Sequence, residues 1–438
     1  MLRLNLRDNA PKWFALMAIG SPKIGLLGAV FLVVANMMGT GIFTTTGFLV
    51  ADMPSRTWVM VAWMIGGGVA LLGSLCYGDL IRQWPASGGE YLFLSQSLHP
   101  SLGYVAGWLS LLVGFSAPVA AACHAAGSYL QPWLWGVDER WVGTSCLVLF
   151  SFFHGKGLRW GGHLQNGLVL LKLIILVLCV IWVIPRMPEI ETGPTWEFEL
   201  DTFSVSLVWI YFSYCGWNAA VYLAGEIARP TQTVPIALIL GTLIVIIFYL
   251  ALNLIFLWAG PLEYIAGKEN IATITFESLG GPILGKVLTF AIVIALLTSV
   301  SAMTMAGPRV YAQMAEDGYL PEIFTPAKQP GWTNILLQGV LALLMLWIPS
   351  FQGLIAYMGF TLGIGASLSI IGLMKRKRQH PKTCQVTGWP WVPGAFLMVV
   401  SWVTLFSIWR EPIPSLFGIL TLLIGWLVWW CQRSPHST

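Results

Sequence analysis

The feature that most constrains this chain is the repetition of long apolar blocks, separated by short polar or Pro/Gly-rich breaks. The blocks are about 18–25 residues long, the length that an α-helix needs to cross the hydrocarbon core of a bilayer. Charged residues make up only 10% of the 438 residues, whereas soluble domains carry roughly 25%. Because so few charges cannot cover a water-facing surface, we expect one all-α membrane domain over residues 1–438.

Twelve apolar blocks lie between such breaks, of which 142–153 is the shortest, and they predict twelve transmembrane helices. They span residues 24–50, 57–80, 102–130, 142–153, 162–184, 203–224, 234–259, 283–306, 333–348, 352–374, 391–409 and 413–431.

The lysines and arginines are distributed unevenly between alternate connections. With both termini on one side, that side holds sixteen of the 23 and the opposite side holds six, while Lys172 lies within a helix. Since positive residues are retained on the cytoplasmic side, we expect a multi-pass protein of the cytoplasmic (inner) membrane with both termini in the cytoplasm. An odd number of helices would destroy this asymmetry.

The first and sixth helices carry glycine and polar residues near mid-membrane, where residues 36–43 read NMMGTGIF and residues 214–218 read YCGWN. Glycine lowers the cost of leaving helical geometry, and unwound backbone exposes N–H and C=O groups that lipid cannot satisfy. A zwitterionic amino acid can satisfy them, with its carboxylate at a half-helix N-terminus and its ammonium on freed carbonyls. We therefore expect two interrupted helices around a substrate site. Close helix packing is the alternative explanation for the glycines.

The two interrupted helices come first in helices 1–5 and 6–10, respectively. Inverted-repeat transporters place their broken helices in this way. We therefore expect a first repeat over residues 24–184 and an inverted second repeat over residues 203–374. Helices 11 and 12, residues 391–431, follow.

Several motifs lie in a fixed order along residues 25–325. They are GTGIF at 39–43, PASGGEY at 85–91, QN at 165–166 with Lys172, FSYCGWN at 212–218, GEI at 225–227 with Pro230, and Arg309 with AEDG at 315–318 and LP at 320–321. In combination they resemble the amino acid–polyamine–organocation superfamily, and within it the L-type amino acid transporters and their bacterial relatives. The resemblance implies a five-plus-five inverted-repeat fold and secondary active transport by alternating access.

The resemblance also implies a substrate site built from the two interrupted helices. Its residues would be Asn36, Gly39, Thr40, Gly41, Phe212, Cys215, Gly216, Trp217 and Asn218. The helix 1 members would receive the substrate carboxylate, Phe212 would form an aromatic gate, and Cys215 and Asn218 would line the side-chain pocket. Cys215 stands where relatives often carry glycine, which predicts a narrower pocket.

Lys172 is the one lysine or arginine that lies well inside an expected helix. A charged lysine at the bilayer centre costs about 2.5–3.5 kcal/mol on translocon scales. The resemblance places Lys172 where sodium-coupled relatives hold a cation, so it would replace sodium or titrate during transport. Snorkelling of its long side chain to the interface is the alternative. The functional interpretation implies sodium-independent transport, by proton symport or by exchange.

The nineteen carboxylates fall in connections or at helix ends, so we expect no Asp or Glu at mid-membrane depth. This favours neutral L-amino acids as substrates over basic amino acids or polyamines. That alternative stays open because aromatic residues also hold cations. Without clustered carboxylates for a metal ion, we expect no enzyme, no metal and no cofactor. A non-transporting sensor with the same fold is a third possibility.

The sequence also bears on partners. The basic residues sit in short connections, so the net charge of +4 does not indicate nucleic acid. The external connection 131–140 has no cysteine, and eukaryotic relatives join a glycoprotein subunit there by a disulfide. No such subunit is implied, and the expected partners are the amino acid substrate and membrane lipid.

Overall fold

The computed structural model describes residues 23–134, 136–189, 198–325, 331–348, 351–382, 384–410 and 412–432. The termini, which we predicted to be cytoplasmic, lie largely outside these ranges. Among the described residues, the only β-pairing is an isolated bridge between Ile24 and Ile227. The elements in chain order are α2 (Leu26–Met37), α3 (Gly41–Asp52), α4 (Arg56–Gln83), α5 (Glu90–Ser97), α6 (Pro100–Leu109), the π-helix η1 (Ser110–Ser116), α7 (Ala117–Leu130), the 3-10 helix η2 (Gln131–Trp133), α8 (Glu139–Gly155), α9 (Leu158–Val183), the 3-10 helix η3 (Ile184–Arg186), α10 (Leu200–Ser213), the 3-10 helix η4 (Ala219–Glu226), α11 (Pro230–Trp258), the 3-10 helix η5 (Leu262–Tyr264), α12 (Ile271–Glu316), the 3-10 helix η6 (Glu322–Phe324), α13 (Trp332–Leu346), α14 (Phe351–Gln379), α15 (Trp391–Arg410) and α16 (Pro412–Gln432).

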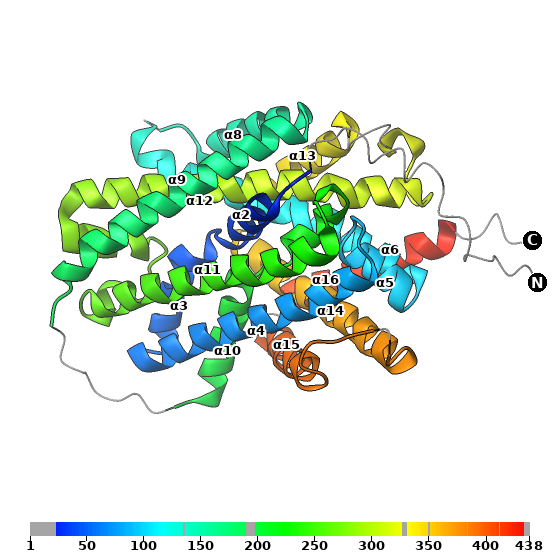
Figure 1. Ribbon diagram of the computed structural model, residues 1–438. Coiled ribbons are helices and arrows are strands. Elements are labelled where there is room, and N and C mark those ends of the chain that lie inside the picture. The colour runs from blue at the N-terminus through cyan, green and yellow to red at the C-terminus, as the bar shows by residue number, and fades with distance from the viewer. Residues whose placement is uncertain are drawn as a thin grey trace, which may run out of the picture.

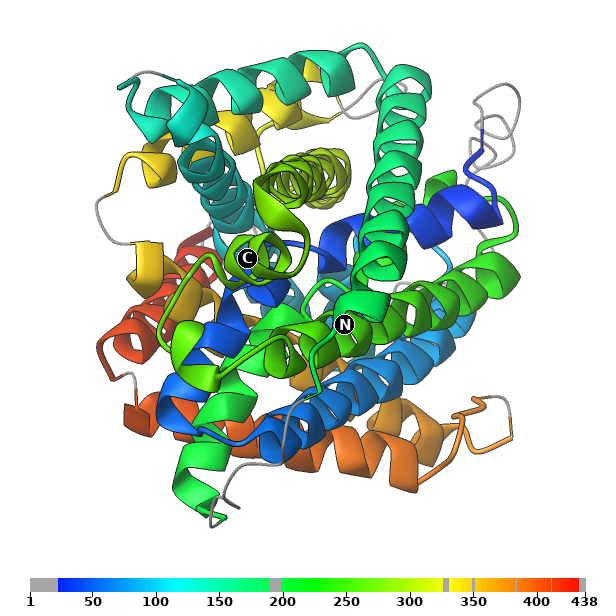
Figure 2. The same cartoon turned by 90° about the vertical axis from the view of Figure 1, so that its left-hand side faces the viewer.

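The helices form one bundle around α2 and α3. Helices α4, α11 and α12 run lengthwise through it (Figure 1), and α2 packs against α9, α11 and α12. Helix α2 is buried along most of its length, whereas α15 and α16 lie at the edge of the bundle (Figure 2). The apolar core is therefore centred on the segment that we predicted to be interrupted.

The outer helices expose large apolar side chains. Ile181 on α9 is 60% exposed, Leu405 on α15 is 66% exposed, and Ile413 on α16 is 68% exposed. Soluble proteins rarely expose apolar surface on this scale, but lipid accepts it. Within the described residues, nine helices are long and apolar enough to cross a membrane, and α10 and α13 are shorter apolar helices. These findings agree with an all-α membrane fold, while the count of twelve crossings stays a prediction.

Each of the twelve expected segments contains a helix, but several boundaries were wrong. Helix α5 was not predicted, because its eight residues are too few and too mixed to form an apolar block. The expected eighth helix was to start at 283. This start agrees with the structure, because α12 consists of two helices that meet at a kink at Gly281 (φ 80°, ψ 176°), and a shorter helix from Ile271 precedes the kink. The expected eighth helix was to end at 306, but α12 continues through Pro308 to Glu316.

The expected third helix is divided by the π-helix η1. Pro118 follows η1 and has no amide hydrogen to donate into the preceding turn. The Ser116 hydroxyl donates to the Leu111 carbonyl at 2.6 Å and satisfies one acceptor in this widened turn. Short π segments often occur at functional sites, and this one places Phe115 beside the cavity described below.

Candidate functional site

The first helix is interrupted between α2 and α3. Helix α2 ends at Met37, Met38 leaves helical geometry at φ −80° and ψ 74°, and α3 begins at Gly41. The amides in the first turn of a helix have no partner within it, and Thr40 makes no capping hydrogen bond through its side chain. The start of α3 therefore carries free donors and the positive end of a helix dipole.

The sixth helix is interrupted at the matching position in the second half of the chain. Helix α10 ends at Ser213, a turn follows, and the chain resumes as η4 from Ala219. Gly216 in this turn has φ +101°, a region that side-chain-bearing residues rarely adopt. Both predicted interruptions are thus confirmed.

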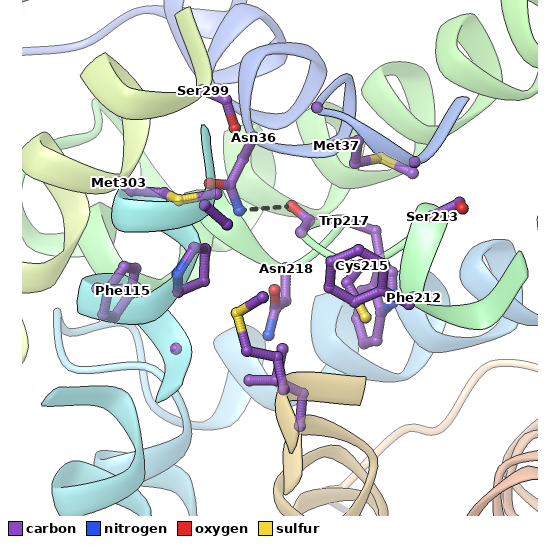
Figure 3. Close-up of a pocket in the computed structure, with 18 of the residues that line it drawn as sticks. Asn36, Met37, Phe115, Phe212, Ser213, Cys215, Trp217, Asn218, Ser299 and Met303 are labelled. Carbon is purple, nitrogen blue, oxygen red and sulfur yellow. Dashed lines mark hydrogen bonds between the residues drawn. The ribbon is translucent and has the colours of Figure 1, made fainter. Parts of the chain in front are cut away.

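The two interruptions touch each other. The Asn36 side-chain amide donates to the Gly216 carbonyl at 3.3 Å (Figure 3). A Cβ atom on Gly216 would lie 2.9 Å from the carbonyl carbon of Asn36, and a Cβ on Gly41 would lie 2.7 Å from the Cα of Ser213. The glycines therefore serve close packing as well as unwinding, so the two explanations offered for them are compatible.

Tyr249 of α11 joins both breaks and was not among the predicted site residues. Its hydroxyl lies 2.7 Å from the Met37 carbonyl and 3.0 Å from the Ser213 carbonyl, and donates to both. These are the last carbonyls of α2 and α10, which have no helical partner. One tyrosine in a strongly apolar stretch was its signal in the sequence.

All nine predicted substrate-site residues line one cavity between the interruptions (Figure 3). The structure adds residues that the sequence did not indicate, from η1, α7, α12 and α14. They include Phe115, Ala122, Ser299, Met303, Met358 and Leu362. Their side chains are mainly apolar, so the cavity offers backbone donors along one wall and a hydrophobic space opposite.

Phe212 lies between this cavity and a second one. The second cavity is lined by Phe48 and Asp52 of α3, Trp209 of α10 and Arg410 of α15, and Phe212 contributes to both. Phe212 is thus shared by the central cavity and the cavity that is lined by Asp52 and Arg410. This position fits the gate that the resemblance implies.

Lys172 lies outside the cavity and is completely buried. Its ammonium group donates to the Thr298 hydroxyl at 2.8 Å, which in turn donates to the Ala295 carbonyl at 2.7 Å. Among the described residues, no carboxylate lies within 4.0 Å of it. The side chain therefore points into the bundle between α9 and α12, and the snorkelling alternative does not describe it.

Glu90 overturns one expectation about the site. The sequence correctly places it at a helix end, as the first residue of α5, but its carboxylate lines the central cavity. Tyr77 donates to its Oε1 atom at 2.6 Å, and the Asn218 amide donates to the same atom at 3.1 Å. We inferred from the expected absence of carboxylates at mid-membrane depth that none would serve the substrate, and this inference was wrong, because the chain folds back under the cavity after α4.

The end of the bundle that carries α5, called here the α5 end, is tied together by polar contacts. Arg309 of α12 forms two hydrogen bonds of 2.9 Å to the carboxylate of Glu226 at the end of η4. The Ile24 amide donates to the Glu226 carbonyl at 2.9 Å, and the Gly225 amide donates to the Ser87 hydroxyl at 3.0 Å. These contacts join the chain before α2 to η4, the α4–α5 connection and α12, and they close this end.

Comparison with known proteins identifies the family of this chain. Residues 24–430 match the family described as amino acid permease. The chain belongs to the amino acid permease family. The match covers both interrupted helices and everything between α2 and α16, which confirms the resemblance found from the motifs.

Several curated relatives of this permease are similar over most of its length. The large neutral amino acids transporter small subunit 2 of Homo sapiens is 25% identical over 92% of this chain and 79% of its own. The serine/threonine exchanger SteT of Bacillus subtilis is 25% identical over 86% of this chain and 90% of its own. The Asc-type amino acid transporter 1 of Mus musculus is 24% identical over 92% and 79%. The permease is thus an amino acid carrier of the membrane and not an enzyme.

Proposed function

We propose that this permease carries neutral L-amino acids by alternating access, without sodium, as a proton symporter or an exchanger. The observation that carries the proposal is the pair of touching helix interruptions beside one cavity. The amides at the start of α3 suit a carboxylate, since a helix N-terminus attracts negative charge. The Ser213 carbonyl keeps an acceptor lone pair beside its hydrogen bond from Tyr249 and suits an ammonium group, and the apolar wall suits an uncharged side chain.

The structure changes the argument for neutral substrates. Glu90 in the cavity removes the argument that no carboxylate is available for a second cation, and it favours the alternative of basic amino acids or polyamines. Against that, the relatives are named for large neutral amino acids and for serine and threonine. The apolar side chains around the cavity also favour neutral substrates.

The contacts at the two ends support alternating access. Phe212 separates the central cavity from the second cavity, while Arg309 and Glu226 close the α5 end. We propose that the α5 end faces the cytoplasm and that the inner membrane holds the protein, because the charge asymmetry of the connections favours this orientation. We further propose that the carrier acts without a disulfide-linked subunit, because the connection 131–140 contains no cysteine.

Uptake by proteoliposomes tests the proposal. Labelled leucine, serine and arginine are offered to vesicles holding the purified protein, with sodium or choline as the external cation and with or without internal amino acid. We expect leucine or serine uptake that is equal in the two salts. Uptake of arginine alone would support the alternative substrate class, and uptake of none would support the non-transporting sensor.

Removing polar groups from the cavity should weaken substrate binding. We expect Thr40→Ala and Asn218→Ala to raise the dissociation constant about tenfold or more, since a hydrogen bond to a charged group contributes about 1.5–3 kcal/mol. The measurement is titration calorimetry with the amino acid that the vesicles accept. Ser145→Ala is the control, because that hydroxyl bonds within α8, away from the cavity. Unchanged affinity in both cavity variants would contradict the assignment.

Lys172→Met should abolish most transport and leave folding intact. Methionine fills the volume of the buried side chain but removes the ammonium that reaches Thr298, so we expect uptake to fall by about tenfold or more while the thermal unfolding midpoint does not fall. Lys172→Ala should behave similarly, and sodium that restores its uptake would identify Lys172 as a substitute for the ion. Lys156→Met, at the exposed end of α8 over Phe152, is the matched control. Normal rates in Lys172→Met would remove this lysine from the mechanism.

A further inference from the structure

Glu90, the first residue of the short helix α5, lies in the connection between two membrane spans, and the fold places it at the substrate cavity. It lies outside the neighbouring membrane spans, Arg56–Gln83 and Pro100–Leu130, yet it is only 7% exposed. Gly89 before it has φ +55° and is pressed against η4, where a Cβ atom would lie 2.3 Å from the Tyr222 ring. This tight approach directs the next side chain under the cavity.

The two carboxylate oxygens of Glu90 have different surroundings. The hydrogen bonds from Tyr77 and Asn218 both end on Oε1. The Oε2 atom faces Gly365 of α14, where a Cβ atom would lie 2.6 Å away, and no described residue donates a hydrogen bond to it. One oxygen is therefore held in place, and the other is left for a proton.

The groups that face Glu90 carry no positive charge. They are Tyr77 from α4, Tyr211 from α10, Cys215 and Asn218 from the turn after α10, Tyr222 from η4 and Gly365 from α14. Phenols and thiols are ordinarily neutral at pH 7. Among the described residues, no lysine, arginine or histidine forms an ion pair with this carboxylate.

A buried carboxylate without a cation favours its protonated form. Burial raises the pKa of Glu90 to about 7, although the hydrogen bonds from Tyr77 and Asn218 act in the opposite direction. Closing the cavity over a substrate excludes the remaining water, which disfavours the charged form further. A zwitterionic neutral amino acid has no net charge, so it does not compensate the carboxylate.

We propose that Glu90 is the proton-binding site of this carrier: a neutral amino acid binds to the form with a proton on Oε2, and both cross the membrane together. This rests on the proposed transport of neutral amino acids and names its coupling ion. The proton comes from the medium on the side where the cavity is open, and the carboxylate returns it to water when the opposite end opens. Lys172 then has a role other than carrying this proton.

The sign of the linkage follows from this protonation. Below pH 7 the free protein already holds the proton, so the affinity for the amino acid is constant. As the pH rises above 7, binding must take up a proton from solution, and the affinity falls by up to about tenfold per pH unit. Glu90→Gln, which keeps an acceptor for Tyr77 and Asn218 but is always neutral, removes this pH dependence.

Calorimetry in two buffers with different ionisation enthalpies tests the proposal directly. Leucine and serine are titrated into the purified protein at pH 6, 7 and 8, and the difference between buffers gives the protons taken up per amino acid bound. In the wild type we expect few protons to be taken up per amino acid bound at pH 6 and close to one at pH 8. In Glu90→Gln we expect no proton to be taken up at any pH. Glu322→Gln, which changes an exposed carboxylate on η6, should behave like the wild type.

The possible outcomes distinguish a proton-binding role of Glu90 from a counter-ion role and from a failure of the proposed function. Binding of leucine or serine without proton uptake at pH 8 overturns the proposal, as does equal uptake in Glu90→Gln. Binding of arginine alone, lost in Glu90→Gln, makes Glu90 a counter-ion for a cationic substrate and also overturns it. No binding of any amino acid contradicts the proposed function instead. If Glu90→Gln does not fold, Tyr77→Phe decides, because removing this donor should move the onset of proton uptake to higher pH, and an unmoved onset overturns the proposal.

Discussion

Replacing Gly216 with alanine is expected to abolish transport. Gly216 has φ +101°, and forcing a residue with a side chain into such a region costs about 1–3 kcal/mol. The added Cβ atom would also lie 2.7 Å from the Asn36 amide nitrogen and 2.9 Å from the Asn36 carbonyl carbon. The two interruptions must then move apart, which breaks the hydrogen bond from Asn36 and displaces both walls of the cavity.

The measurement is uptake of the accepted amino acid by proteoliposomes, with the thermal unfolding midpoint recorded in parallel. We expect uptake to fall by more than about tenfold, the factor that corresponds to 1.4 kcal/mol. Gly267→Ala measures the effect of backbone strain without a steric clash. Gly267 also has positive φ (+70°), but no atom lies within 4 Å of the added Cβ. Gly68→Ala, in open space on helix α4, controls for alanine itself. Normal uptake by Gly216→Ala would show that the two breaks need not touch.

The interruptions could be predicted from the sequence because local chemistry determines them. Glycine beside polar residues at mid-membrane depth has few explanations, so residues 36–43 and 214–218 were sufficient to place the breaks. The nine predicted cavity residues, Phe212 among them, followed from the resemblance to the family, and all nine line the cavity. The contact between Asn36 and Gly216 could not be predicted, because it depends on how two segments 180 positions apart meet.

Glu90 and Tyr249 were missed for related reasons. Hydropathy assigns Glu90 to a loop, and only the fold shows that the loop turns back beneath the cavity. Tyr249 lies in a strongly apolar helix, where a tyrosine is normally interpreted as a packing residue. Only the structure shows that its hydroxyl bonds to the Met37 and Ser213 carbonyls. Gly281 does mark a helix boundary, because the two helices of α12 meet there at a kink, whereas Pro308 looks like a helix end although the second helix continues past it to Glu316. A proline costs less where neighbouring groups satisfy the freed backbone.

Replacing Arg309 with alanine is expected to open the α5 end and destabilise the protein. The Arg309 side chain is 8% exposed and Glu226 is 22% exposed, with two hydrogen bonds of 2.9 Å between them. Breaking a buried ion pair by removing one partner costs about 3–5 kcal/mol, and we expect somewhat less because water reaches Glu226. Without the guanidinium, these two hydrogen bonds between η4 and α12 are lost. The equilibrium therefore shifts toward the state open at this end.

The thiol of Cys215, which lines the central cavity, reports the opening. An impermeant maleimide applied from the α5 side of vesicles should label Cys215 faster in Arg309→Ala than in the wild type, as followed by mass spectrometry of the labelled peptide. The unfolding midpoint should fall in the same variant, and Arg309→Ala with Glu226→Ala should recover part of it because no unpaired charge remains. Arg82→Ala is the control, since Arg82 is 46% exposed and its buried partner Asp79 keeps the hydrogen bonds that it accepts from Thr387. Equal labelling rates in Arg309→Ala and Arg82→Ala would show that this ion pair anchors the fold without gating the cavity.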